Sequence, residues 1–87
     1  MTMPIDNIIL PPNIVKIAER LLTSIEAADS MLQGVKVGAR AEGFVLGLET
    51  GRCIQPDQIE ELYVLFDEAT STSLEKLAAS SPNGEEG

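Results

Sequence analysis

The sequence lacks histidine and tryptophan, and its only cysteine is Cys53. Without histidine, the chain is missing the commonest zinc ligand and the usual base that activates a serine or cysteine nucleophile. A single cysteine excludes an internal disulfide and is typical of a reducing compartment. We therefore expect a cytoplasmic protein with no metal, no cofactor and no enzymatic activity.

Positive charge is also scarce, because six Lys and Arg residues stand against 14 Asp and Glu residues, for a net charge of −8. Residues 55–87 hold most of the acids and only one base, Lys76. Since phosphate contacts supply most of a protein's affinity for nucleic acid, we expect no nucleic-acid partner. A helix–turn–helix DNA-binding protein is excluded as well, because its recognition helix would begin with the acid-rich run "QPDQIEELYVLFDEA".

Long hydrophobic runs are absent, and no stretch approaches the roughly 20 apolar residues that cross a bilayer, so we expect no membrane partner. Aromatic residues are few, with one Tyr and two Phe, so aliphatic side chains must build the core. The 87 residues form one small domain, which buries only about 60% of its unfolded surface. Because neither a disulfide nor a metal stabilises it, we expect self-association.

What the sequence does contain is helical periodicity. The first predicted helix covers residues 14–33, with Asn13 as its N-cap and Gly34 as its stop. Its apolar positions recur every three or four residues: Ile14, Ala18, Leu21, Ile25, Ala28 and Leu32.

The second predicted helix runs from Val35 or Lys36 to Thr50, and Gly51 ends it. At about 100° per residue, one narrow arc of this helix forms its core face. That arc consists of Val37, Ala41, Phe44 and Leu48. Cys53 follows in the turn, where we expect a small buried side chain.

The third predicted helix starts at Pro56, with Gln55 as its N-cap, and continues to about Ala79. The Ser- and Thr-rich stretch 69–73 has poor helix propensity, so the alternative is a break near residue 71. We favour one helix because its apolar positions stay in phase.

These elements predict an all-α fold, a three-helix antiparallel bundle that occupies residues 14–79. An extended N-terminal arm precedes it at residues 1–13, since Pro4, Pro11 and Pro12 prevent a helix there. Residues 80–87 have the composition of a disordered acidic tail. We expect the arm to cover its own bundle, and the alternative is that it covers a neighbouring subunit.

Several apolar residues fall outside the predicted core faces, and we expect them to contact a second copy or a protein partner. The candidate interface combines them with the arm and two glycines: Val35, Gly43, Leu46, Gly47, Val64, Leu65, Ile8, Ile9 and Leu10. The two glycines weaken a helix, so something should press against them. We expect a helix to do so, and a ligand or partner is the alternative.

The basic residues of the central segment, Lys36, Arg40 and Arg52, are candidates for binding a small anion. Two of them lie beside the glycine pair on the second predicted helix. In an oligomer, a groove at this position is a candidate site for a nucleotide or a similar ligand.

The stretch "AEGFVLGLETGRCIQPDQIEELYVLFDEA", residues 41–69, combines a Gly-rich helix, a Gly stop, an Ile and a helix that starts with Pro. In this it resembles the helical hairpins of small stand-alone phage and prophage proteins. The resemblance implies a protein that binds and blocks a host protein, or one that sequesters a small signalling nucleotide. No individual binding residue carries over from it.

The sequence therefore favours a non-enzymatic protein-binding module, such as a phage-encoded protein that blocks a host defence protein. A basic surface on the partner would be attracted to the acidic C-terminal part of the chain. The alternatives are an oligomeric binder of a small anionic ligand and a structural or assembly protein.

Overall fold

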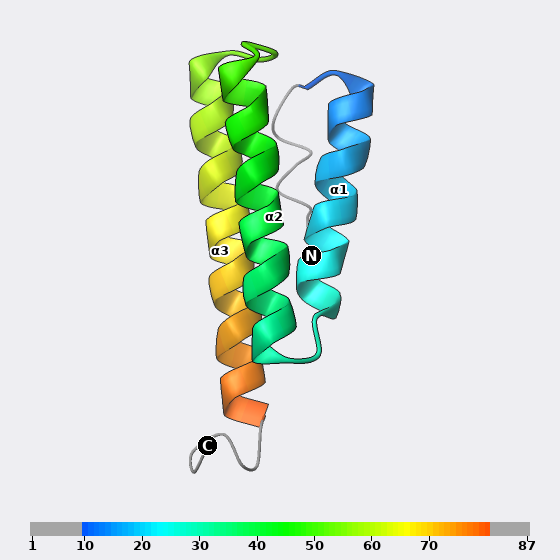
Figure 1. The fold of residues 1–87 in the computed structure, drawn as a ribbon, viewed down its shortest axis with the longest axis vertical. Coiled ribbons are helices and arrows are strands. Elements are labelled where there is room, and N and C mark those ends of the chain that lie inside the picture. The colour runs from blue at the N-terminus through cyan, green and yellow to red at the C-terminus, as the bar shows by residue number, and fades with distance from the viewer. Residues whose placement is uncertain (1–9, 81–87) are drawn as a thin grey trace.

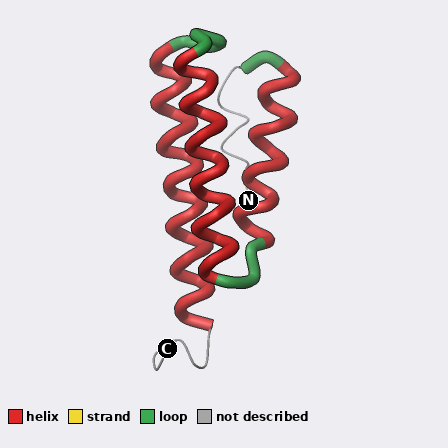
Figure 2. The backbone as a smooth tube through the Cα atoms, viewed as in Figure 1, coloured by secondary structure: helices red, strands yellow, loops and turns green. Residues whose placement is uncertain are grey.

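The computed structural model describes residues 10–80 and shows three α-helices packed side by side (Figure 1). They are α1 (Pro12–Ala27), α2 (Met31–Thr50) and α3 (Pro56–Ser80). Short links join them, so each helix runs antiparallel to the one before it (Figure 2). The predicted all-α, three-helix antiparallel bundle is confirmed. The predictions for the acidic tail and for most of the N-terminal arm lie outside the described residues.

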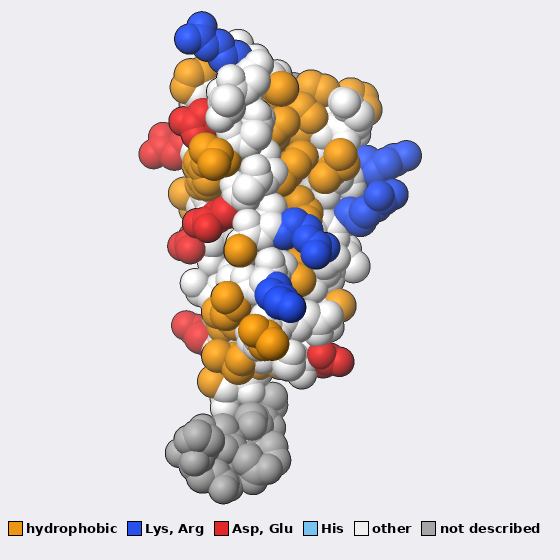
Figure 3. All heavy atoms as spheres, viewed as in Figure 1, with side chains coloured by type: hydrophobic (Ala, Val, Ile, Leu, Met, Phe, Trp, Pro, Cys, Tyr) orange, Lys and Arg blue, Asp and Glu red, His pale blue; other side chains and the backbone are white. Residues whose placement is uncertain are grey.

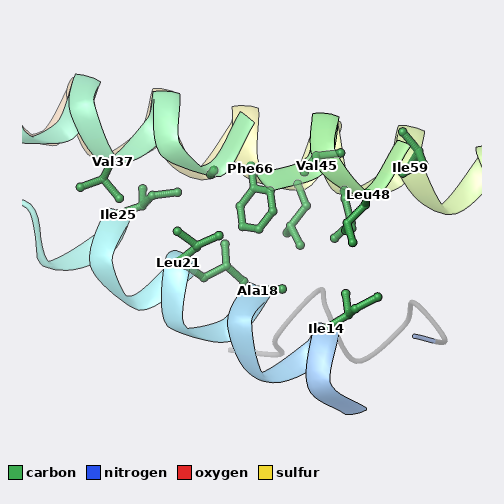
Figure 4. Close-up of a cluster of buried hydrophobic side chains, with 13 residues drawn as sticks. Ile14, Ala18, Leu21, Ile25, Val37, Val45, Leu48, Ile59 and Phe66 are labelled. Carbon is green, nitrogen blue, oxygen red and sulfur yellow. The ribbon is translucent and has the colours of Figure 1, made fainter. Parts of the chain in front are cut away.

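The core lies along the axis between the three helices, and aliphatic side chains dominate it (Figure 4). Its most deeply buried large side chains are Phe66, Ile25, Leu62 and Val45. Leu10, the one residue of the predicted arm interface that the structure describes, is half-buried and packs against this cluster. It therefore contacts its own bundle.

The boundary between the first two helices was predicted wrongly. The first helix ends at Ala27, and Ala28 then takes an extended conformation, with a φ of −58° and a ψ of 132°. Ser30 caps α2, because its side-chain oxygen accepts a hydrogen bond of 3.1 Å from the backbone N–H of Gln33. The side chain of Gln33 in turn accepts one of 3.1 Å from the backbone N–H of Asp29. This reciprocal capping starts α2 at Met31, four or five residues before the predicted start at Val35 or Lys36.

Three residues near the starts of the first two helices have roles other than the predicted ones. Gly34 lies inside α2 and is buried, so it does not stop a helix. Leu32 was predicted in the core but belongs to α2 and is 67% exposed. The first helix begins at Pro12 with Pro11 before it, so Asn13 is not its cap.

The link between α2 and α3 agrees better with the sequence. The second helix ends at Thr50, and α3 begins at Pro56. The backbone N–H of Gln55 donates a 2.7 Å hydrogen bond to the side chain of Gln58. Gly51 ends α2 with a φ of −82°, and it is Arg52 that takes the left-handed conformation, with a φ of 53°.

The third helix is continuous to Ser80, so the favoured single helix is confirmed over a break near residue 71. One of its serines has a defined role inside the bundle. The hydroxyl of Ser73 is buried and donates a 2.8 Å hydrogen bond to the backbone carbonyl of Ile25. A serine in a stretch of poor helix propensity thus ties α3 to the last turn of α1.

Candidate protein-binding surfaces

Three residues of α2 and α3 are buried to a different extent from what the sequence predicted. Val45 is fully buried, whereas Phe44 is only half-buried. Leu65, a predicted interface residue, is 8% exposed and belongs to the core. It is unavailable to a partner because α3 packs against both other helices, which widens its buried arc.

The outer face of α2 is opposite its buried side and carries few charges. Three large aliphatic side chains stand out from it: Leu32 is 67% exposed, Val35 is 53% exposed and Leu46 is 55% exposed. Smaller exposed residues at helical spacing fill the intervals. We define the outer face of α2 as Leu32, Val35, Ala39, Gly43, Leu46, Gly47 and Thr50.

The predicted helix neighbour of Gly43 and Gly47 is absent from the chain's own bundle. A Cβ atom added at either position would meet nothing within 4 Å in the described structure. The glycines of α2 that do face another helix are Gly34 and Gly38. Cβ atoms there would lie 2.8 Å from Leu74 and 2.7 Å from Thr70.

Charged residues flank the outer face of α2 with opposite signs. Glu49 lies toward α3, because its carboxylate accepts a 3.3 Å hydrogen bond from the hydroxyl of Tyr63. Glu42 lies on the same edge and lines a groove together with Asp67 of α3. At about 100° per residue, Lys36 and Arg40 lie on the opposite edge. The view in Figure 3 agrees, since most acidic side chains gather on its α3 side and most basic ones lie over α2 and α1, with one more at the top near the link between α2 and α3.

The groove between α2 and α3 has a volume of about 230 Å³ and small residues along part of its wall. Gly38, Ala39 and Thr70 are among its lining residues, and Val35 and Leu74 add apolar side chains. It borders the outer face of α2 and makes the apolar surface of that helix continuous with α3.

The outward side of α3 has a different character and forms an acidic face. Val64, a predicted interface residue, is 50% exposed there. Exposed carboxylates precede and follow it at helical spacing. We define the acidic face of α3 as Asp57, Glu60, Glu61, Val64, Asp67, Glu68 and Glu75.

The three predicted anion-binding residues do not meet in one place. Lys36 and Arg40 are exposed one turn apart on α2, whereas Arg52 lies beyond the C-terminal end of that helix. At 1.5 Å per residue, roughly 15 Å separates Arg40 from the end of α2. Arg52 instead lines a separate hollow with Glu49, Gln55 and Pro56.

Other chemistry finds little support in the described part of the chain. Cys53 is exposed, so the expectation of a buried side chain was wrong. Residues 10–80 contain no group of three His, Cys, Asp or Glu side chains placed to hold a metal ion. None of the helices in this range is long and apolar enough to span a membrane.

The chain shows no significant match in comparisons with protein-family models, curated proteins or solved structures. Its candidate surfaces therefore rest on its own residues. Sequence reasoning found Val35, Leu46 and Val64 but missed Leu32, because it assigned that residue to the wrong helix. The Ser30–Gln33 spacing is the signal that would have placed Leu32 on α2.

Proposed function

We propose that this chain is a non-enzymatic protein-binding module whose acidic face on α3 covers a basic surface of a partner protein. The observation that carries the proposal is the position of Val64. An apolar side chain that is 50% exposed lies among six exposed carboxylates on one side of one helix.

The charge of α3 supports a partner of opposite sign. Residues 56–80 contain six acids and only one base, Lys76. Such a surface attracts a basic partner over a distance and aligns it before contact, most strongly at low salt. Val64 supplies the apolar contact that resists added salt, because burial of apolar area is not screened.

A double charge reversal on α3 tests this proposal. Glu61 and Glu68 are exposed seven residues apart, so Glu61→Lys with Glu68→Lys reverses two charges on the acidic face. The wild-type chain, immobilised, is expected to retain a basic protein from a lysate of its source cells. The double variant should lose that protein at low salt, when proteins are identified by mass spectrometry.

The first helix offers a matched control, because Glu19 and Glu26 are also exposed and seven residues apart. Glu19→Lys with Glu26→Lys changes the net charge by the same amount on a different surface, so it should leave retention unchanged. A second variant, Val64→Asp, should weaken retention most clearly at moderate salt. The proposal is overturned if no retained protein depends on Glu61, Glu68 or Val64 at either salt concentration.

A further inference from the structure

The outer face of α2 is largely apolar, with Lys36 toward its basic side, yet nothing in the described part of the chain covers it. Leu32, Val35 and Leu46 are each more than half exposed, and Gly43 and Gly47 have open space at their Cβ positions. Glycine in an exposed helix interior costs roughly 1 kcal/mol relative to alanine. Within the bundle, Gly43 and Gly47 make no close contact that would offset this loss of helix stability.

The charges on its two edges identify what would cover this face. Lys36 and Arg40 lie on one edge, and Glu42 and Glu49 lie on the other. A two-fold axis parallel to α2 would place the basic edge of one copy against the acidic edge of the other. A perpendicular two-fold axis, which makes the helices antiparallel, would place like charges together on both sides.

We propose that α2 pairs in parallel with α2 of a second copy of this chain. In register, Arg40 and the partner's Glu42 differ by two residues, or about 3 Å along the helix axis. Long side chains reach across such a pair, and symmetry forms the contact twice. Within one helix the same two residues are two positions apart and do not face each other.

The two α2 helices of the proposed dimer would come closest where their small residues lie. Ala39, Gly43 and Gly47 are spaced four apart, which makes a shallow groove along one i+4 row of the helix. Two helices that pack along such rows approach closely, and a shallow crossing of about 20° keeps the outer faces of both copies in contact along their length. Leu46 and Val35 then contact their counterparts on either side of the crossing. The glycines without a role inside the bundle are explained by this contact.

This pairing uses a different helix from the proposed partner surface, so each can fail without the other. It leaves both acidic faces of α3 uncovered by α2. A dimer that presents two such faces gains avidity for a partner with two basic sites.

Oligomeric state tests the pairing directly. The purified 87-residue chain is expected to sediment as a dimer at high-micromolar concentration. Leu46→Asp should raise the dimer dissociation constant by at least about 100-fold, because both copies lose a buried leucine. Ile17→Asp is the matched control, since Ile17 is an exposed aliphatic residue on α1, and the dimer should persist. Circular dichroism verifies that both variants remain folded.

The charge pairing has its own test. Arg40→Glu should weaken the dimer about tenfold, and adding Glu42→Arg should restore it, because the exchanged pair is again complementary. A merely structural role for Arg40 predicts no such rescue.

Helix direction is tested by cross-linking with Thr50→Cys in a Cys53→Ser background. Thr50 lies on the outer face near the end of α2, so the parallel dimer should form an intermolecular disulfide under mild oxidation. In an antiparallel dimer the two positions would be roughly 25 Å apart, and no disulfide would form. A monomer at all concentrations, a dimer indifferent to Leu46→Asp, or a dimer that Thr50→Cys does not cross-link would each overturn the proposal.

Discussion

The first two helices of this bundle bury similar aliphatic stripes, yet their outward sides differ. The outward side of α1 carries charged residues, with Lys16, Glu19, Arg20 and Glu26 exposed. The outward side of α2 carries Leu32, Val35 and Leu46, with glycines between them. A helix that only completes a bundle needs one apolar face. The second apolar face on α2 is the observation from which the proposed dimer is argued.

The largest expected change in stability comes from placing an aspartate either in the core face of α1 or on the outer face of α2. Leu22 of α1 is 3% exposed, so Leu22→Asp buries an unpaired carboxylate and removes a packed side chain. We expect the free energy of unfolding to fall by more than about 3 kcal/mol, as measured by urea denaturation. The same change at Leu46 should alter it by no more than about 0.5 kcal/mol at concentrations where the chain is monomeric. Equal losses at the two positions would show that the outer face of α2 is buried in the monomer.

The features that the sequence predicted correctly depend on residues close together in the chain, such as helix caps and the spacing of apolar residues. Pro56 and Gln55 marked the start of α3 correctly, because proline has no backbone N–H to be left unpaired at the first helical position and its fixed φ suits a helix. The periodic stripe of α1 predicted its buried side from Ile14 to Ala28. Val35, Leu46 and Val64 were predicted outside the core, and all three are at least half exposed.

The predictions that failed concern two kinds of residue. Some lie where two helix-boundary signals compete, and others are buried only because of how the three helices pack. Gly34 read as a helix stop, but the reciprocal capping around Ser30 ended α1 earlier and placed this glycine against Leu74. Phe44 and Val45 lie about 100° apart, on opposite edges of the buried arc of α2, and the position of the other helices decides which edge is buried more deeply. Leu65 lies where α3 packs against two partners, which one helix's periodicity does not reveal.

A pair of glycine substitutions compares the two sides of α2 itself. At Gly38, a new methyl group would lie 2.7 Å from the Cγ2 atom of Thr70, a stiff β-branched side chain. We expect Gly38→Ala to lower stability by about 1 kcal/mol, since overpacking exceeds the gain in helix propensity. Gly43→Ala meets no atom within 4 Å and should raise the stability of the monomer by about 0.5–1 kcal/mol.

Thermal unfolding at low protein concentration measures both changes, and opposite signs are the expected result. Gly34→Ala is an informative control, because its nearest atom is the flexible end of Leu74, which can move aside. Its loss should be smaller than that of Gly38→Ala. A destabilised Gly43→Ala monomer would mean that the outer face is not open.

The smallest expected effect is a change in the pKa of Tyr63, at the acidic edge where α2 meets α3. Partial burial raises the pKa of Tyr63 above its ordinary value of 10.0, and the nearby carboxylates of Glu49 and Glu42 raise it further. Because the fold favours the neutral phenol, its contribution to stability is complete below pH 10 and is lost as the pH rises through the raised pKa.

Glu49→Gln should lower the pKa of Tyr63 toward its ordinary value, since it removes the nearest negative charge. The chain has a single tyrosine, so an ultraviolet absorbance titration reports this group alone. Glu75→Gln, farther along α3, removes the same charge as a control and should leave the titration unchanged. An unchanged midpoint in Glu49→Gln would place this carboxylate away from Tyr63 in solution.

The two short links of the bundle, residues 28–30 and 51–55, have a consequence for how the chain reaches this fold. Each helix pairs with the next one in sequence through a loop of a few residues, so most contacts join residues that are close along the chain. Domains with such low contact order fold in microseconds to milliseconds. A fast-folding chain spends little time with its aliphatic stripes exposed, which suits a protein that keeps a second apolar face on its surface after folding.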